Sequence, residues 1–158
     1  MSFEFSADEI FTMAEQMERN GQQFYTEAAE AVQSAEHKKL LWELAGMEVD
    51  HEKTFKTMRA ELTRKEKETN VFDPEGEAAL YLKALVDTRV FFKKEMDVSS
   101  MEKILKAAIE AEKDSIVFYL GMKNAVPEEL GRGRLDEIIK EEMNHVRLLS
   151  RELVKLHR

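Results

Sequence analysis

Two stretches of this sequence each place a glutamate and a histidine, three residues apart, where an amphipathic helix should be apolar. In the segment 135–149, the inward positions at spacings of three and four include Glu142 and His145 among leucines and an isoleucine. In the segment 41–62, Glu48 and His51 take the same kind of position. Burying such side chains without a partner would cost several kcal/mol. The most direct interpretation is that the partner is a metal ion.

A constant shift of 94 residues relates the two motifs, and this indicates an internal duplication. Glu48 and Glu142 are 94 residues apart, and His51 and His145 are separated by the same number. It further brings Glu18 onto Glu112 and Tyr25 onto Tyr119. Each of four expected helices therefore carries one glutamate among its core positions.

Composition favours a helical domain and limits the chemistry of its site. The 158 residues are 43% hydrophobic and 35% charged, with six Gly and two Pro, which is typical of a helix-rich globular chain. A net charge of −8, without a separate block of Lys and Arg, argues against a nucleic-acid partner. Because the chain has no Cys, disulfides and iron–sulfur clusters are excluded, and any metal has oxygen and nitrogen ligands.

Nothing in the sequence indicates export or membrane insertion. The amino terminus lacks the continuous apolar run of a secretory signal. No window approaches the roughly 20 apolar residues that a membrane span needs. We therefore expect a cytoplasmic protein without a membrane partner.

Helix signals in the first part of the chain predict an antiparallel hairpin. Ser6 begins a capping box, and the first helix is expected to run from there to Val32. The second helix is expected from Ala35 past Leu62, into a charged and solvated end at 63–69.

The remaining elements predict a crossover and a second hairpin. A shorter helix is expected in the crossover, from Ala79 to Phe92. The segment from Ser99 to Glu102 has the form of another capping box, and the third helix should run from it to about Asn124. The fourth helix should begin between Pro127 and Leu135 and continue to the end.

These elements predict a single domain over residues 1–158, with a duplication of 6–64 and 99–157 joined by the crossover 65–98. In each hairpin the two inward glutamates are equidistant from the expected turn, so all four carboxylates should meet near mid-height of a bundle. A four-helix bundle with Glu from two helices and Glu-x-x-His from the other two is a described dimetal-carboxylate arrangement.

On these motifs the chain resembles the ferritin-like superfamily and, within it, the rubrerythrin-type di-iron domain without a rubredoxin module. The resemblance spans nearly the whole chain and rests on six residues: Glu18, Glu48, His51, Glu112, Glu142 and His145. It implies an all-α, ferritin-like four-helix bundle, in which a long crossover containing a shorter helix joins two antiparallel helix hairpins.

The resemblance also implies roles for these six residues as metal ligands and as the catalytic residues of an enzyme. Glu48 and Glu142 would bridge two metal ions. Glu18 and His51 would complete the ligands of one ion. Glu112 and His145 would complete the ligands of the other.

Two features depart from the family pattern. Rubrerythrin-type sites usually carry another Glu three residues after the ligand of the third helix, where this chain has Ser115. Loss of that carboxylate should make the centre less anionic and leave a coordination position open or filled by water. The absence of Cys removes a built-in electron donor, so turnover would need electrons from another protein.

The expected cofactor is two Fe ions, with Mn or Zn as alternatives. Four carboxylates together would repel one another, and two divalent ions would cancel their charge. Mixed carboxylate and imidazole ligands suit Fe or Mn and also bind Zn, so the choice of iron follows from the resemblance.

Several further residues were assigned from their position on the helices. Tyr25 and Tyr119, seven residues beyond Glu18 and Glu112, are candidate cofactor-binding groups that could hydrogen-bond ligand carboxylates; packing as plain core aromatics is an equal alternative. Gly21, at an inward position of the first expected helix, could leave room for a small molecule or only allow close packing. Four acidic neighbours of the candidate ligands should point elsewhere and bind no metal: Asp50, Glu52, Asp114 and Glu141.

The function that these features favour is an oxidoreductase in which a di-iron centre reduces dioxygen or hydrogen peroxide, using an external electron-donor protein. The alternative is iron handling, as a ferroxidase or in iron storage. Two other interpretations are a bundle that a metal only stabilises and a polar core without metal. We expect a homodimer.

Overall fold

The computed structural model describes residues 6–62, 77–88, 97–125 and 128–158, and within these ranges all regular structure is helical. The helices are α1 (Ala7–Ala31), α2 (Ala35–Ala60), α4 (Glu77–Thr88), α5 (Met101–Met122) and α6 (Glu128–Leu156). None of the described helices is both long enough and apolar enough to cross a membrane.

The first hairpin follows the sequence signals closely, except at the end of α2. Ser6 caps α1 with a full capping box, in which its hydroxyl accepts from the Glu9 backbone N–H at 3.2 Å. The expectation that α2 passes Leu62 is wrong, because the helix ends at Ala60. The Leu62 side chain still enters the core, so the apolar period continues beyond the last regular turn. The predicted charged end at 63–69 lies outside the described residues.

The crossover helix and the start of α5 differ from the predicted boundaries. Helix α4 begins two residues before the expected Ala79, and its predicted end at Phe92 lies outside the described residues. The predicted capping box at Ser99 is wrong, because Ser100 is the N-cap and accepts from the Lys103 backbone N–H at 3.2 Å. Counted from Ser100, the third helical residue is Lys103, whose ammonium can only donate and cannot close a box.

Helices α5 and α6 form the second hairpin, whose turn includes residues outside the described ranges. Helix α5 ends at Met122, two residues before the expected Asn124. Helix α6 begins at Glu128, within the predicted interval, while Pro127 itself is not described.

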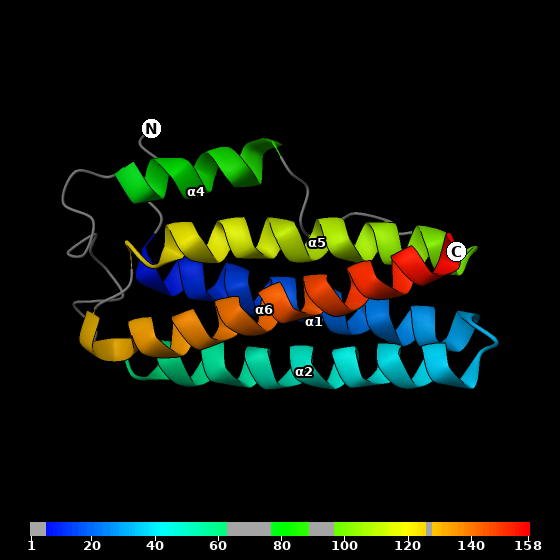
Figure 1. The fold of residues 1–158 in the computed structure, drawn as a ribbon. Helices are drawn as coiled ribbons and strands as arrows, with labels where there is room; N and C mark the ends of the chain where they lie inside the picture. Colours follow the sequence, from blue (N-terminus) through cyan, green and yellow to red (C-terminus); the bar gives the residue numbers. More distant parts are fainter. Residues whose placement is uncertain (1–5, 63–76, 89–96, 126–127) are drawn as a thin grey trace.

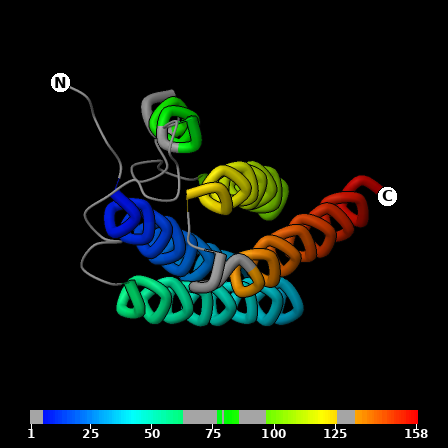
Figure 2. Tube along the Cα trace, turned by 90° about the vertical axis from the view of Figure 1, so that its left-hand side faces the viewer, coloured from blue at the N-terminus to red at the C-terminus, as the bar shows by residue number. Residues whose placement is uncertain are grey.

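Four helices lie side by side as a bundle, and the fifth lies on its outside. Figure 1 shows α1, α2, α5 and α6 running along one direction, with α4 beside α5 at one end. In the end-on view of Figure 2, α1 with α2 and α5 with α6 form two facing pairs. Helix α4 approaches α5 at Gly121, where an added Cβ would lie 2.5 Å from the Tyr81 ring.

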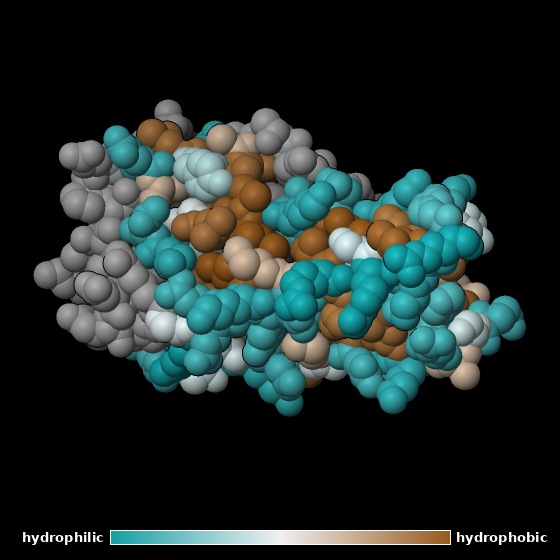
Figure 3. All heavy atoms as spheres, in the orientation of Figure 1, coloured by the Kyte–Doolittle hydropathy of each residue, from teal (hydrophilic) through white to brown (hydrophobic). Residues whose placement is uncertain are grey.

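One face of the bundle is largely polar, with apolar side chains where α4 meets α5. Figure 3 shows hydrophobic residues between these helices and further along the bundle, within a largely hydrophilic face. The large exposed apolar side chains on the two helices are Leu80, Tyr81, Val117 and Leu120.

Two apolar clusters fill the two ends of the bundle and leave its middle to polar groups. One cluster includes Phe11, Phe55 and Tyr119. The other includes Leu41 and Leu105. Neither cluster draws on residues 18–23, 46–54, 110–115 or 140–145, which form the middle turns of the four long helices. The candidate site therefore lies between the two apolar clusters.

We expect Phe55→Ala to lower the free energy of unfolding of the metal-free protein by about 3–5 kcal/mol. The Phe55 side chain is fully buried, and its ring centroid lies 5.1 Å from that of Tyr119 and 6.5 Å from that of Phe11. Urea denaturation followed by circular dichroism measures the change. The control Leu80→Ala, at a side chain that is 66% exposed, should cost less than about 0.5 kcal/mol; equal losses would contradict the assigned core.

Candidate metal centre

Six polar side chains from four helices meet in the middle of the bundle. They come from α1 (Glu18), α2 (Glu48 and His51), α5 (Glu112) and α6 (Glu142 and His145). Each is 5% exposed or less. The structure thus brings together all six residues that the sequence indicated as candidate ligands.

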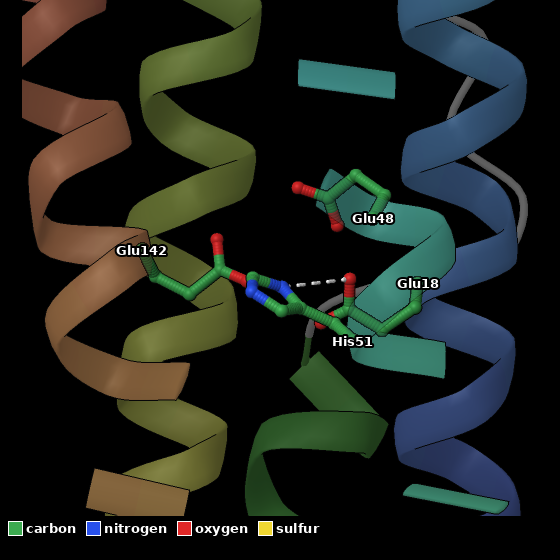
Figure 4. A group of neighbouring side chains, drawn as sticks. All are labelled: Glu18, Glu48, His51 and Glu142. Carbon is green, nitrogen blue, oxygen red and sulfur yellow. Dashed lines mark ion pairs between the residues drawn. The ribbon is translucent and has the colours of Figure 1, made fainter. Parts of the chain in front are cut away.

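The six side chains form two groups that share two glutamates. The first group is Glu18, Glu48, His51 and Glu142, which Figure 4 shows converging from three helices. The second group is Glu48, Glu112, Glu142 and His145. In each group one potential ligand atom per residue lies within 4.8 Å of all the others. Two groups that share Glu48 and Glu142 are compatible with two adjacent metal positions.

Both histidines present Nδ1 to the carboxylates. His51 Nδ1 lies 2.8 Å from Glu142 Oε1 and 3.5 Å from Glu18 Oε2. His145 Nδ1 lies 3.2 Å from Glu112 Oε1 and 3.3 Å from Glu142 Oε2. The two rings are nearly parallel, at an interplanar angle of 22° and a centroid separation of 5.9 Å. The same nitrogen of each ring is therefore available to a metal.

Several atoms of the centre are buried without a hydrogen-bond partner among the described residues. They are Glu18 Oε2, Glu48 Oε1, both carboxylate oxygens of Glu142, and His51 Nδ1. The His51 and Glu142 atoms are close, but they are not aligned as a hydrogen bond. An unpaired buried polar atom costs about 1–3 kcal/mol. Divalent cations would satisfy these convergent oxygen and nitrogen donors, so the residues present fit a pair of metal ions.

Burial and mutual repulsion make the metal-free centre hold protons. Burial, and then the neighbouring carboxylates Glu18 and Glu112, raise the pKa of Glu48 well above its usual value. Burial and the same neighbours, together with Glu48, raise the pKa of Glu142 likewise. For Glu112, burial is outweighed by Glu142, His145 and Tyr25, so its pKa is lowered.

His51 also favours its protonated form in the absence of metal. Burial alone would lower the pKa of its imidazole, but the carboxylates of Glu18 and Glu141 raise it to about 9. A metal ion entering the centre must therefore displace protons.

Two buried tyrosines donate hydrogen bonds to candidate ligands across the bundle. Tyr25 Oη on α1 donates to Glu112 Oε1 on α5, and Tyr119 Oη on α5 donates to Glu18 Oε1 on α1, each at 2.5 Å. Burial and the nearby carboxylates raise the pKa of both phenols well above 10, so the hydroxyls keep their protons. The predicted hydrogen bonds are present, while a role of the tyrosines towards a cofactor stays a prediction.

Gly21 does not leave an open space beside the Glu48 carboxylate. A Cβ at Gly21 would lie 3.0 Å from Glu48 Oε2 and 3.2 Å from Glu48 Cδ. The space at Gly21 is thus filled by the Glu48 carboxylate itself. Ser115 directs its hydroxyl to the carbonyl oxygen of Ala111, at 3.0 Å along its own helix.

Sequence reasoning misjudged Glu141. It belongs to neither four-residue group, but its Oε2 lies 2.5 Å from His51 Nε2, so it does not point away from the centre. Spacing along α6 could not reveal this contact, because His51 is on α2. By contrast, Glu52 turns away as expected and pairs with Arg19 at 2.7 Å. Asp50 and Asp114 also belong to neither group, and Asp50 is exposed.

Glu15 is a second acidic residue that the sequence reasoning missed. The residue is 1% exposed, and Arg59 Nε lies 3.2 Å from its Oε2. Burial raises its pKa although Arg59 opposes the shift. Its position three residues before Glu18 places it on the same face of the helix, and this spacing could have indicated that it is buried.

Comparison with known proteins places these observations in a family. The family model described as Rubrerythrin matches residues 9–153. Among solved structures, the chain is similar to the crystal structure of a ferritin-like diiron-carboxylate protein from Thermotoga maritima. The two are 25% identical, each chain is covered over 97% of its length, and the TM-score is 0.72. The comparison with curated proteins gave no significant match.

We expect the metal-free protein to lose stability as pH rises from about 5 to 9. The folded pKa values of Glu48, Glu142 and His51 are raised, so the folded state holds protons that the unfolded chain has released. Their stabilisation is full below the unfolded pKa values and is lost as pH rises through the folded ones. Melting temperatures of protein treated with a chelator measure this.

The double variant Glu48→Gln, Glu142→Gln serves as the control, because it removes the two carboxylates of the centre and leaves every other charged group of the chain in place. Its melting temperature should depend less on pH than that of the wild type. An equal dependence in both proteins would contradict the assigned protonation of the centre.

We expect Gly21→Ala to weaken metal binding by about 10-fold, because the new Cβ would displace the Glu48 carboxylate. Gly46→Ala is a matched control on α2, since its Cβ would have nothing within 4 Å. The control should leave affinity unchanged and stabilise the helix by about 1 kcal/mol. Isothermal titration with Zn(II) distinguishes the two variants, and unchanged affinity in Gly21→Ala would contradict the assigned position of Glu48.

Proposed function

Because the chain belongs to the rubrerythrin family, we propose that its buried Glu/His centre holds two iron ions and reduces dioxygen or hydrogen peroxide with electrons from another protein. The observation that carries this proposal is the pair of four-residue groups that share Glu48 and Glu142. A centre that only needed one structural ion would not require two shared carboxylates flanked by matched glutamate and histidine pairs.

In this proposal the chain positions two ions next to each other and keeps water out. Glu48 and Glu142 would be shared by the two ions, and one glutamate and one histidine on either side would each serve a single ion. Bound as ferrous ions, the pair supplies the two electrons that reduce hydrogen peroxide to water. The apolar clusters above and below exclude bulk water, which strengthens every electrostatic interaction inside.

The tyrosines fix the two carboxylates that serve a single ion. Tyr119 Oη holds Glu18 through Oε1 and leaves Oε2 without a hydrogen-bond partner, and Tyr25 Oη holds Glu112 through Oε1. Because the pKa values of the phenols are raised, each hydroxyl remains a donor over the physiological range. Carboxylates held in this manner need little rearrangement when the charge of the centre changes.

Charge balance supports a pair of divalent ions. The proposed ligands are four carboxylates and two neutral imidazoles, and two divalent ions cancel four negative charges. Ser115 replaces the further glutamate that is usual in the family, and its hydroxyl is bound to the Ala111 carbonyl oxygen. The proposed centre is accordingly less anionic than the family pattern.

Iron handling is the second candidate function. The absence of Cys favours it, since the chain has no thiolate-bound iron that could return electrons to the centre. A ferroxidase needs no such reductant, because ferrous iron is itself the substrate. Iron content and assembly size separate the candidates: about two irons per chain in a small homodimer supports the redox protein, and many irons per chain in a large assembly supports storage.

The proposal predicts that the anaerobically prepared protein with two Fe(II) per chain is reoxidised rapidly by hydrogen peroxide or by dioxygen. Stopped-flow absorbance of the ferric product measures the rate with each oxidant. The variant Glu48→Gln, Glu142→Gln, which removes both shared carboxylates, should bind less iron and lose the rapid phase. Absence of reoxidation by either oxidant in the wild type would reject the redox function while leaving metal binding intact.

A further inference from the structure

The outer nitrogens of the two histidines meet different atoms. His51 Nε2 lies 2.5 Å from Glu141 Oε2, and His145 Nε2 lies 3.2 Å from Met47 Sδ. The inner nitrogens are alike, since both rings direct Nδ1 to the carboxylates. The two halves of the centre therefore differ behind their histidines.

Glu141 and Met47 are equivalent positions of the duplicated chain. Each directly precedes the glutamate of a Glu-x-x-His motif, and they are 94 residues apart. Each crosses to the histidine of the facing motif, Glu141 from α6 to α2 and Met47 from α2 to α6. Because one of these equivalent positions holds Glu and the other holds Met, one histidine has a carboxylate partner and the other has a thioether partner.

The rest of the centre is closely matched between the halves. Tyr119 donates to Glu18 and Tyr25 donates to Glu112, both at 2.5 Å. The two shared glutamates face both halves. Among the direct contacts of the candidate ligands, the contact behind each histidine therefore distinguishes the two proposed metal positions.

This contact matters because of the proton on the outer nitrogen. An imidazole that binds a metal through Nδ1 carries its proton on Nε2 and donates it outward. A carboxylate is a strong, charged acceptor for that proton, whereas a thioether sulfur is a weak one. The carboxylate also fixes the ring orientation and makes the imidazole a stronger donor to the metal.

We propose that Glu141 is a positioning residue for His51 and makes the two metal positions unequal, so that the position of Glu18 and His51 fills first and binds a divalent ion more tightly. The position of Glu112 and His145, backed by Met47, binds the second ion more weakly. This inference rests on the proposed dimetal centre and adds an order of binding to it. The Glu141 side chain is 49% exposed. We therefore expect the two metal affinities to differ by about 10-fold, which is the lower end of the effects that hydrogen-bond partners of metal ligands have on affinity.

Titration of the metal-free protein with Co(II) tests the inference, because Co(II) binding is visible as absorbance and requires no oxidant. The wild type should bind two ions in two steps whose affinities differ by about 10-fold. Glu141→Met should weaken the first step and bring the two steps together. Met47→Glu should tighten the second step instead, so the inference remains testable if one variant folds poorly.

The exchanged variant Met47→Glu, Glu141→Met provides the sharpest comparison, because it keeps the composition and net charge. Crystals with one Co(II) per chain should show anomalous density beside His51 in the wild type and beside His145 in the exchanged variant. Density beside His145 in the wild type, or no change of position after the exchange, would overturn the proposal.

Two controls separate positioning from charge and from folding. Glu137→Met removes an exposed carboxylate one turn before Glu141, and Met143→Glu adds one at a side chain that is 47% exposed. Both should leave the ratio of the two affinities unchanged. Equal weakening of both steps in Glu141→Met would mean a merely structural role, and two equal steps in the wild type would also reject the inference. Absence of any Co(II) binding would instead reject the dimetal centre itself.

Discussion

The structure depends on the burial of four carboxylates and two imidazoles between two apolar layers. The layers supply the hydrophobic stabilisation of the bundle, and they also remove water from the polar groups between them. Desolvation is the largest influence on the pKa of both shared glutamates, and repulsion from their neighbours adds to it. The raised pKa values mean that the metal-free centre retains protons, which an entering ion would have to displace.

The same centre connects the two hairpins. Among the described residues, the hydrogen bonds from one hairpin to the other gather at mid-height, where each tyrosine reaches a glutamate of the facing hairpin. An exposed pair, Arg134 with Glu61, is the exception near the end of α2. Both apolar clusters draw residues from the two hairpins, and the polar contacts at the centre add directional contacts between them. The geometry of the site is thus part of the tertiary structure.

The sequence was sufficient to predict the bundle and the six clustered residues, because a helix puts residues three and four apart on one face. A glutamate and a histidine in an apolar seam must both be buried, and the shift of 94 residues predicts that all four helices contribute. Helix ends were less predictable, since Leu62 continues the apolar pattern after the hydrogen-bonded turns have stopped. The contact of Glu141 with His51 was missed because it depends on the relative rotation of two helices.

The predicted duplication would account for the matched candidate ligands, and the two halves differ at positions next to those candidate ligands. In the first hairpin, buried Glu15 and Glu52 pair with arginines. The equivalent positions of the second hairpin are Ile109 and Val146, which pack in an apolar cluster. Charge is thus concentrated beside one half of the centre. Because the candidate ligands themselves are matched, such neighbours are where the surroundings of the two proposed metal positions differ.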